Sequence, residues 1–419
     1  MEYEHLRTAD GVVYHTMLKE IERINTGLEL IPSENIPSRA TLEALGSVFN
    51  DKYSEGYPGK RYYGGNEFID VIENLAIERA KLLFGAEHVN VQPYSGSPAN
   101  MEVYLAFMKP GDTLMGMRLE DGGHLTHGHK VSFTGKLFNA VQYGVNRETE
   151  LLDYNEIEKI ALEAKPKVIV CGTTAYPRQI DFKAFHEIAK KTEAVSVGDI
   201  AHIAGLIIGG VHQSPFPYID VVTTTTHKTL RGPRGAMIMC KQKFASAIDE
   251  AVFPGMQGGP HDHVTAAMAV ALGEALKPEF KDYAKQVVKN AKALAEALME
   301  NGFRLVTGGT DNHLMVVDLR NRGITGKEAE ALLDSAGISV NKNTIPFDPR
   351  KPFDPSGIRI GTPTVTTQGM KEEQMRQIGR LITEAIDSRD DRRKLEQIQR
   401  RVKELCQAFP AFPAYPAPA

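Results

Sequence analysis

One lysine in the sequence stands where it could act as a chemical group rather than as a surface charge. Lys228 follows the apolar run 219–222 and the four threonines 223–226 without a break. This order predicts a lysine at the carboxyl end of a buried strand, where open α/β sheets bind ligands. Most lysines are solvated surface cations. A lysine removed from water has a lowered pKa and can form a Schiff base with an aldehyde.

A carboxylate follows a second apolar run in the same way. Asp199 comes just after residues 194–197, and His202 lies three residues further on. Taken alone, Asp199 is more simply explained as a capping or turn residue. Together, Lys228 and Asp199 match pyridoxal phosphate, which needs a lysine for its aldehyde and a carboxylate that keeps its ring nitrogen protonated.

Two further segments could hold charged groups. Ser95, Gly96 and Ser97 lie between a predicted strand and the start of a helix. Their N–H groups can face a phosphate, although a plain serine cap is commoner. No nucleotide-binding glycine motif is present. Arg359 lies in the apolar run 358–361, where we expect it to clamp a carboxylate or, as the simpler alternative, to form a buried ion pair.

Two glycine-rich loops are open to more than one interpretation. Residues 119–129 contain three histidines, which invites a zinc site, but no HExxH or Cys/His grouping appears. We therefore predict no metal, and a histidine that stacks on a planar cofactor instead. Residues 53–65 are rich in Tyr, Gly, Lys and Arg. This loop is either an RNA-binding loop or one that supplies Glu55 as an acid/base group and tyrosines as hydrogen-bonding groups.

The elements that must position these residues alternate along the chain. In the first part of the chain, we expect helices at 67–84 and from about Ser97, and strands at 89–91, 167–171, 194–197 and 219–222. This alternation predicts a mostly parallel sheet covered by helices.

A second, smaller α/β domain is expected after residue 278. It begins with an amphipathic helix at 279–301 and ends with two helices. Between them we expect a helix at 327–336 and strands at 303–306, 314–319, 338–341 and 358–361. The predicted organisation is an N-terminal arm (1–40), a large domain (41–278), a small domain (279–408) and a Pro/Ala-rich tail (409–419).

Composition limits the class of protein. The chain has 419 residues, of which 42% are hydrophobic, and a net charge of −4. This near-balance argues against a general nucleic-acid binder. Three widely spaced cysteines argue against a disulfide framework and for a reducing compartment. No apolar run approaches the ~20 residues of a membrane helix. We expect a cytoplasmic enzyme without nucleic-acid or membrane partners.

Across residues 28–370, the sequence resembles the serine hydroxymethyltransferase (glycine hydroxymethyltransferase) family. The resemblance is densest in six blocks: 33–35, 55–65, 122–128, 199–205, 223–235 and 253–260. It implies a fold-type I, aspartate-aminotransferase-like pyridoxal phosphate enzyme with a large, mostly parallel-sheet domain and a smaller C-terminal α/β domain. It also implies a homodimer with shared active sites, with a tetramer as the alternative.

The implied activity belongs to one-carbon metabolism and glycine biosynthesis. The transferase would interconvert L-serine and glycine and exchange the one-carbon unit with tetrahydrofolate, giving 5,10-methylenetetrahydrofolate. The amino acid would react as a Schiff base with pyridoxal phosphate, which would be covalently held by Lys228 between turnovers. The residues expected to take part in catalysis are Lys228, Glu55, His124, Asp199, His202, Tyr63 and His227.

The resemblance also implies the ligand contacts. The cofactor ring would lie against His124, with Asp199 at its nitrogen and His202 near its hydroxyl. The other implied cofactor contacts are Ser95, Gly96, Ser97, Thr174 (where the family usually has Ser) and, from the neighbouring subunit, Tyr53, Gly258 and Gly259. Ser33 and Arg359 would hold the substrate carboxylate, and Glu55 and Tyr63 would enter from the neighbouring subunit. The implied folate contacts are Leu119, Gly123, His124, Leu125, Asn343, Lys351, Pro352 and Phe353.

Three alternatives stay open at this point. Lys351 replaces a frequent Ser at the folate edge, so the carrier could be a modified pterin. A threonine-aldolase-like lyase would share Lys228 and Asp199 but would need no folate. A non-catalytic RNA-binding protein would keep RNA affinity and show no turnover.

Overall fold

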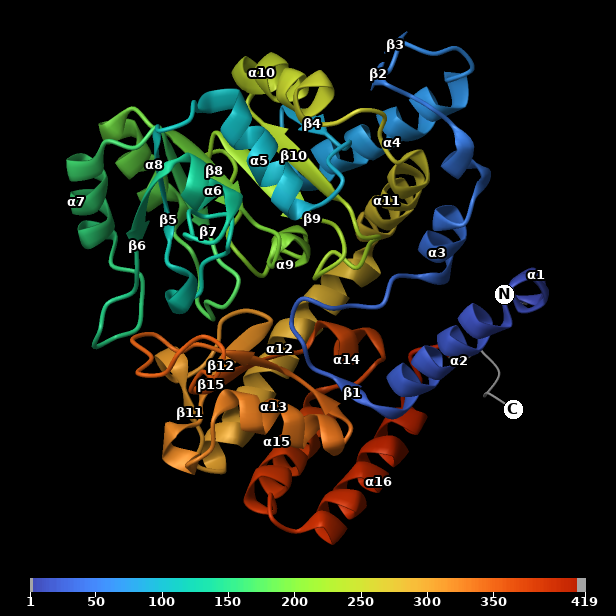
Figure 1. The fold of residues 1–419 in the computed structure, drawn as a ribbon, viewed down its shortest axis with the longest axis vertical. Coiled ribbons are helices and arrows are strands. Elements are labelled where there is room, and N and C mark those ends of the chain that lie inside the picture. The colour runs from blue at the N-terminus through green and yellow to red at the C-terminus, as the bar shows by residue number, and fades with distance from the viewer. Residues whose placement is uncertain (1–2, 413–419) are drawn as a thin grey trace.

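The structure, a computed structural model, describes residues 3–412 of the chain. A seven-stranded sheet forms the centre of its larger half, in the order β4, β10, β9, β8, β7, β5, β6 (Figure 1). The strands are β4 (His88–Asn90), β5 (Thr113–Met117), β6 (Asn139–Tyr143), β7 (Val168–Gly172), β8 (Val195–Asp199), β9 (Val221–Thr225) and β10 (Ala236–Cys240). Only β10 runs antiparallel to its neighbours. The expected mostly parallel sheet is confirmed.

Helices cover both faces of this sheet. They are α4 (Glu67–Phe84), α5 (Gly96–Phe107), α6 (Phe133–Leu137), α7 (Tyr154–Ala164), α8 (Phe182–Thr192), α9 (Ala204–Ile208), α10 (Ala245–Glu250) and α11 (Asp262–Ala275). Alternate residues of β7 enter different apolar clusters. Val168 and Val170 join one cluster, and Ile169 and Cys171 join the other. A strand buried on both faces explains why β7 is apolar throughout.

The smaller half contains a four-stranded antiparallel sheet, in the order β11, β12, β15, β14. Its strands are β11 (Arg304–Leu305), β12 (Leu314–Asp318), β14 (Asn341–Asn343) and β15 (Gly357–Gly361). Its helices are α13 (Gly326–Ser335), α14 (Pro363–Thr367), α15 (Glu372–Asp387) and α16 (Arg392–Ala408). The long helix α12 (Pro278–Glu300) joins the halves, because its first turns enter the large core and its later turns the small one.

The N-terminal segment runs along the small half before it reaches the large one (Figure 1). It consists of α1 (Glu4–Ala9), α2 (Gly11–Thr26), β1 (Leu28–Glu29) and α3 (Arg39–Leu45), followed by the hairpin β2 (Gly56–Tyr57) and β3 (Lys60–Arg61). β1 pairs in parallel with β13 (Ile338–Ser339), and Leu28 and Leu30 lie in the small core. None of the helices described between residues 3 and 412 is long and apolar enough to cross a membrane.

Several element boundaries differ from the sequence-based expectation. The helix at 67–84 is confirmed, and it ends at Gly85 in the left-handed conformation (φ 70°) that favours glycine. The strand expected at 219–222 lies at 221–225, because its threonines pair with β10. The strand expected at 303–306 is cut short by a 3₁₀ turn.

The C-terminal half shows two more differences. The strand expected at 338–341 divides into β13 and β14, since its two parts pair with β1 and β15. Residues 409–412 begin the expected tail, and there Phe409 packs on the small core and the N–H of Phe412 donates to Asn25 Oδ1. The remainder of that tail, 413–419, lies outside the described residues.

Candidate active site

A cavity of about 350 Å³ lies at the carboxyl edge of the central sheet and takes residues from both halves of the chain. Many of the predicted site residues line it: Ser33, Ser95, Gly96, Ser97, His124, Thr174, Asp199, His202, His227, Lys228 and Arg359. Residues from seven separate stretches of sequence therefore meet at one place.

Asp199 and Lys228 reach the cavity from neighbouring strands. Asp199 is the last residue of β8 and pairs with Thr223 of β9. Lys228 lies three residues beyond the end of β9. Because β8 and β9 are parallel, their carboxyl ends share one edge of the sheet, which is where the sequence predicted the two side chains to meet.

Asp199 is a buried carboxylate held by two hydrogen-bond donors. His127 Nδ1 accepts the backbone N–H of His124 (3.3 Å), so its Nε2–H donates to Asp199 Oδ2 (3.0 Å). Asn100 Nδ2 donates to the same oxygen (2.9 Å). Burial alone would raise the pKa of Asp199, but these hydrogen bonds outweigh burial and hold that pKa below its usual range. Asp199 is therefore ionised at neutral pH.

The same loop contains a group of potential metal ligands. One ligand atom each from His124, His127 and Asp199 lies within 4.8 Å of the others. However, His127 Nε2 already donates to Asp199, and His124 Nδ1 accepts the N–H of Thr126 (3.2 Å). Hydrogen bonds thus account for this arrangement, and burial, followed by the neighbouring His127, lowers the pKa of His124 to about 4.

The amine of Lys228 has an unusual environment. Burial lowers its pKa to about 8; the charge of Asp199 opposes this shift, while Arg359 and Arg234 add to it. The backbone carbonyl of Lys228 accepts a hydrogen bond from Asn35 Nδ2 (2.9 Å). A substantial fraction of this amine is neutral near physiological pH, as Schiff-base chemistry requires.

Arg359 in β15 brings a positive charge into the cavity from the small half. Its Nη1 donates to the Thr174 carbonyl (2.8 Å) and its Nε to Asn341 Oδ1 (3.1 Å). Burial lowers its pKa to about 10, with no opposing contribution from a carboxylate. Within residues 3–412 no ion pair involves Arg359, so the alternative of a buried ion pair is wrong. Its guanidinium is available for the carboxylate of a ligand.

The start of α5 provides a site for a further anion. Ser95 is the N-cap residue, yet its hydroxyl makes no capping hydrogen bond. A Cβ atom at Gly96 would lie 2.7 Å from Thr225 Cγ2, so only glycine fits. The first-turn N–H groups and the serine hydroxyls are thus free to bind a phosphate. Amine, carboxylate, phosphate site and cavity together fit pyridoxal phosphate.

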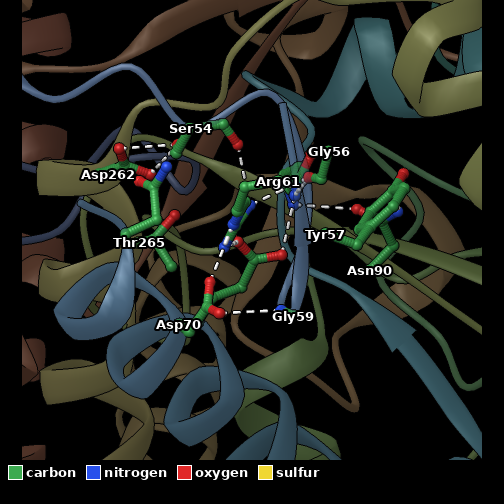
Figure 2. Close-up of polar contacts among 12 residues, drawn as sticks. Ser54, Gly56, Tyr57, Gly59, Arg61, Asp70, Asn90, Asp262 and Thr265 are labelled. Atoms are coloured by element: carbon green, nitrogen blue, oxygen red, sulfur yellow. Dashed lines mark hydrogen bonds and ion pairs between the residues drawn. The ribbon is translucent and has the colours of Figure 1, made fainter. Parts of the chain in front are cut away.

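A separate network holds the loop that contains Glu55 (Figure 2). The buried guanidinium of Arg61 forms ion pairs with Asp70 (2.9 Å) and Glu73 (2.6 Å) and donates to the carbonyl oxygens of Ser54 and Gly56. Ser54 Oγ donates to Asp262 Oδ1 (2.7 Å), at the start of α11. Arg61 is therefore committed to internal contacts rather than presented to an RNA.

Beside this network, five predicted residues form one exposed or half-buried cluster. The members of this Tyr53/Glu55 cluster are Tyr53, Glu55, Tyr63, Gly258 and Gly259. A Cβ atom at Gly258 would lie 3.3 Å from Glu55 Oε1, and the rings of Tyr53 and Tyr63 meet edge to face at 5.2 Å. Tyr53 and Tyr63 are 58% and 48% exposed. None of the five lines the cavity that contains Lys228.

Of the predicted folate contacts, only His124 lines the cavity. The turn that begins at Leu119 is joined to the Asn343 segment, because Thr344 Oγ1 donates to the Glu120 carbonyl (3.4 Å). Gly123 and Leu125 flank His124 in this region. Lys351, Pro352 and Phe353 are exposed, Phe353 at 87%.

Sequence reasoning missed several residues of the cavity, among them Glu34, Asn100, Thr173 and Arg234, which line it. It also missed Asn35 and His127, which hydrogen-bond to Lys228 and Asp199. For Asn100 a signal existed, because it lies one helical turn after Ser97 on the same face of α5. For His127 the only signal was its place in the histidine-rich loop, which suggested metal rather than a hydrogen bond to Asp199.

These features define a fold-type I pyridoxal phosphate enzyme. The sequence model of the family described as serine hydroxymethyltransferase matches residues 6–382. The chain is 59% identical to the serine hydroxymethyltransferase of Desulfotalea psychrophila over 405 residues, covering 97% of this chain and 95% of the relative. It is 58% identical over 407 residues to that of Koribacter versatilis, covering 97% and 96%. The chain belongs to the serine hydroxymethyltransferase family.

The position of the Lys228 pKa gives a pH prediction. Only the neutral amine attacks an aldehyde, so the rate at which cofactor-free protein captures added pyridoxal phosphate should rise through about pH 8 and then level off. At pH 7 roughly one tenth of the Lys228 amines are neutral, against about one in 2500 for a lysine of ordinary pKa. Stopped-flow absorbance measures this rate. A rate that keeps rising beyond pH 10 would contradict the assigned environment.

Proposed function

We propose that the cavity at the ends of β8 and β9 is where this serine hydroxymethyltransferase interconverts L-serine and glycine. The observation that carries the proposal is the convergence of Lys228, the ionised Asp199 and the unpaired Arg359 on one cavity. The one-carbon unit passes to tetrahydrofolate, giving 5,10-methylenetetrahydrofolate, and the reverse reaction makes serine.

The charged residues of the cavity have different roles. When bound, pyridoxal phosphate supplies an aldehyde for amino groups and a ring that takes up the electron pair of a broken Cα bond. Arg359, beside Ser33, binds the substrate carboxylate and so orients Cα. Asp199 keeps a proton on the ring nitrogen. Lys228 would hold the cofactor aldehyde between turnovers, and its amine, set free when the substrate amine takes its place, can then accept a proton.

The histidines of the cavity are suited to contact a cationic ring. Burial lowers the pKa of His124 to about 4 and that of His227 to about 3, so both imidazoles are neutral at physiological pH. A neutral His124 can stack on the cofactor without placing a second positive charge beside the protonated nitrogen. Ser95, Gly96 and Ser97 bind the phosphate, and Thr174 and His202 border the ring.

The Tyr53/Glu55 cluster serves the cavity of a second copy of the chain. Its tyrosines are exposed, and their neighbour Tyr62 is 74% exposed, which is a large aromatic surface for an uncovered face. In a homodimer this face would deliver Glu55 of the partner subunit to the substrate hydroxyl as an acid/base group. Gly258 and Gly259 would reach the phosphate in the same way. A tetramer of two such dimers would keep this arrangement.

Tetrahydrofolate would bind at the junction of the halves. Leu119, Gly123, Leu125 and Asn343 would form its floor, and the segment 351–353 its edge. The exposed ring of Phe353 offers an aromatic surface to the carrier. Because Lys351 stands at the folate edge where Ser is frequent, a modified pterin stays the alternative carrier.

The proposal extends to domain organisation and location. The organisation into a large domain (41–278), a small domain (279–408) and an arm (1–40) agrees with two apolar cores, although the first turns of α12 belong to the large core and the arm contributes to the small one. The three cysteines are buried and unpaired, which fits a reducing compartment and so a cytoplasmic location.

The function is tested by a single substitution. Lys228→Ala should remove the visible absorbance of the protein-bound cofactor and reduce tetrahydrofolate-dependent serine cleavage to background, because Lys228 is the one lysine among residues 3–412 that lines the cavity. Lys159→Ala, at an exposed site on α7, is the control and should leave both unchanged. Wild-type cleavage of serine at full rate without any pterin would instead support a folate-independent aldolase.

Shared active sites are tested by mixing two inactive variants. A hybrid dimer of Lys228→Ala and Glu55→Gln chains contains one intact site, so equal mixtures allowed to exchange subunits should recover about one quarter of wild-type activity. Lys228→Ala mixed with Arg359→Gln is the control, since both residues belong to one chain's cavity and no intact site can form. Absence of recovery in the first mixture would place Glu55 with its own chain's Lys228.

A further inference from the structure

A second histidine, His313, lies behind His202. Along the sequence it is far from every predicted site residue. His313 precedes β12 and is fully buried. Its Nε2 lies 3.2 Å from His202 Nδ1, and the two rings are tilted by 30° with their centroids 5.4 Å apart. Both remaining ring nitrogens, His202 Nε2 and His313 Nδ1, are buried and have no hydrogen-bond partner among residues 3–412.

Both rings are neutral. Burial, followed by the charges of Lys228 and Arg359, lowers the pKa of His202 well below its ordinary value. Burial and the same two cations lower the pKa of His313 to about 3. Each imidazole therefore carries a single proton, and the bond between the rings requires one N–H and one lone pair.

Two proton arrangements satisfy this bond, and they differ in what they leave unpaired. If His202 Nδ1 donates, His313 carries its only proton on Nδ1, as a buried N–H without an acceptor. If His313 Nε2 donates, His313 keeps only a bare lone pair at Nδ1, and the N–H that lacks a partner within the chain is that of His202 Nε2. Buried N–H groups are orphaned less often than acceptors are. His202 lines the cavity, where a bound ligand can accept from its Nε2–H, whereas His313 does not line the cavity and its Nδ1–H would stay unpaired. The second arrangement is therefore favoured, and it puts the proton of His202 on Nε2.

We propose that His313 is a positioning residue that holds His202 in the Nε2-protonated form, so that His202 presents an N–H donor to the ring oxygen of the cofactor. The proposal rests on the proposed function only for the identity of that acceptor. A negatively charged oxygen binds an N–H donor strongly and would be repelled by a lone pair. The backbone of His202 is fixed as well, because Thr229 Oγ1 donates to its carbonyl (2.9 Å).

Several titratable groups face the His202–His313 pair, and one of them, His212, provides a control. Lys228, Arg359 and His124 act on His202, and His212 acts on His313. His212 is also buried, but its Nδ1 is 3.0 Å from the Gln213 carbonyl and so donates to it. His212→Gln thus removes a nearby buried histidine without touching the His202–His313 bond.

The tautomer is measured directly by nitrogen-15 NMR of ring-labelled histidine in the full-length holoenzyme. The His202 signals are assigned by their loss in His202→Gln. We expect a protonated Nε2 and an unprotonated Nδ1 in wild type. A protonated Nδ1 in His202 would overturn the proposal. This readout needs no turnover, so it also stands if the assay of serine cleavage fails.

Two substitutions at His313 test the consequence for cofactor binding. His313→Gln keeps an amide donor near the place of Nε2 and should hold pyridoxal phosphate within about twofold of wild type, whereas His313→Leu removes the donor and should weaken binding by roughly tenfold. His212→Gln should behave as wild type. Equal affinities for the Gln and Leu variants would overturn the proposal. If His313→Leu does not fold, the NMR result and His313→Gln decide.

Wild-type protein that binds no pyridoxal phosphate would overturn the proposed function instead. The tautomer of His202 could then still be as inferred, so the two failures are distinguishable.

Discussion

The site depends on keeping one buried carboxylate ionised. A buried Asp loses its charge unless donors replace the lost water, and Asp199 obtains them from two different elements. Asn100 reaches it from α5, and His127 reaches it from the glycine-rich loop. Thr223 Oγ1 donates to Asn100 Oδ1 (2.7 Å), which turns the amide so that its NH₂ group faces Asp199. The ionised state of Asp199 therefore depends on four segments at once: the ends of β8 and β9, the start of α5 and this loop.

The other part of the machinery is held by a different buried charge. Arg61, compensated by Asp70 and Glu73, anchors the Tyr53/Glu55 cluster on the surface. The two parts are joined through Gln92, whose Nε2 contacts Glu73 and the Gly56 carbonyl, three residues before the phosphate-binding turn. The chain thus holds Lys228 in the cavity and Glu55 in a separate cluster that does not line that cavity.

The sequence predicted those features that follow from local pattern and sheet geometry. Asp199 and Lys228 could be brought together because parallel strands end at a common edge, and the glycine after α4 fixed that helix's end. The strand limits near 221 and 304 could not be predicted, because they depend on pairing partners. Whether Arg359 was paired or free depended on which side chains surround it in three dimensions.

Contacts across long sequence separations were also beyond the sequence. His127 is 72 residues from Asp199, and His313 is 111 residues from His202. Neither pair has a periodicity or a motif that would signal the contact. His127 and His313 each act on another side chain, Asp199 and His202 respectively, through a ring nitrogen. Such a role can be recognised only from hydrogen bonds and unpaired atoms.

Under the proposed function, the charge of Asp199, rather than its shape, drives the reaction. Asp199→Asn keeps the shape and removes the charge. The variant should still bind pyridoxal phosphate at Lys228, with visible absorbance retained, while serine cleavage falls by about a thousandfold. Asp220→Asn, which alters a carboxylate paired with Lys241 outside the cavity, should retain cleavage. Cleavage by cofactor-loaded Asp199→Asn within about tenfold of wild type would contradict the account.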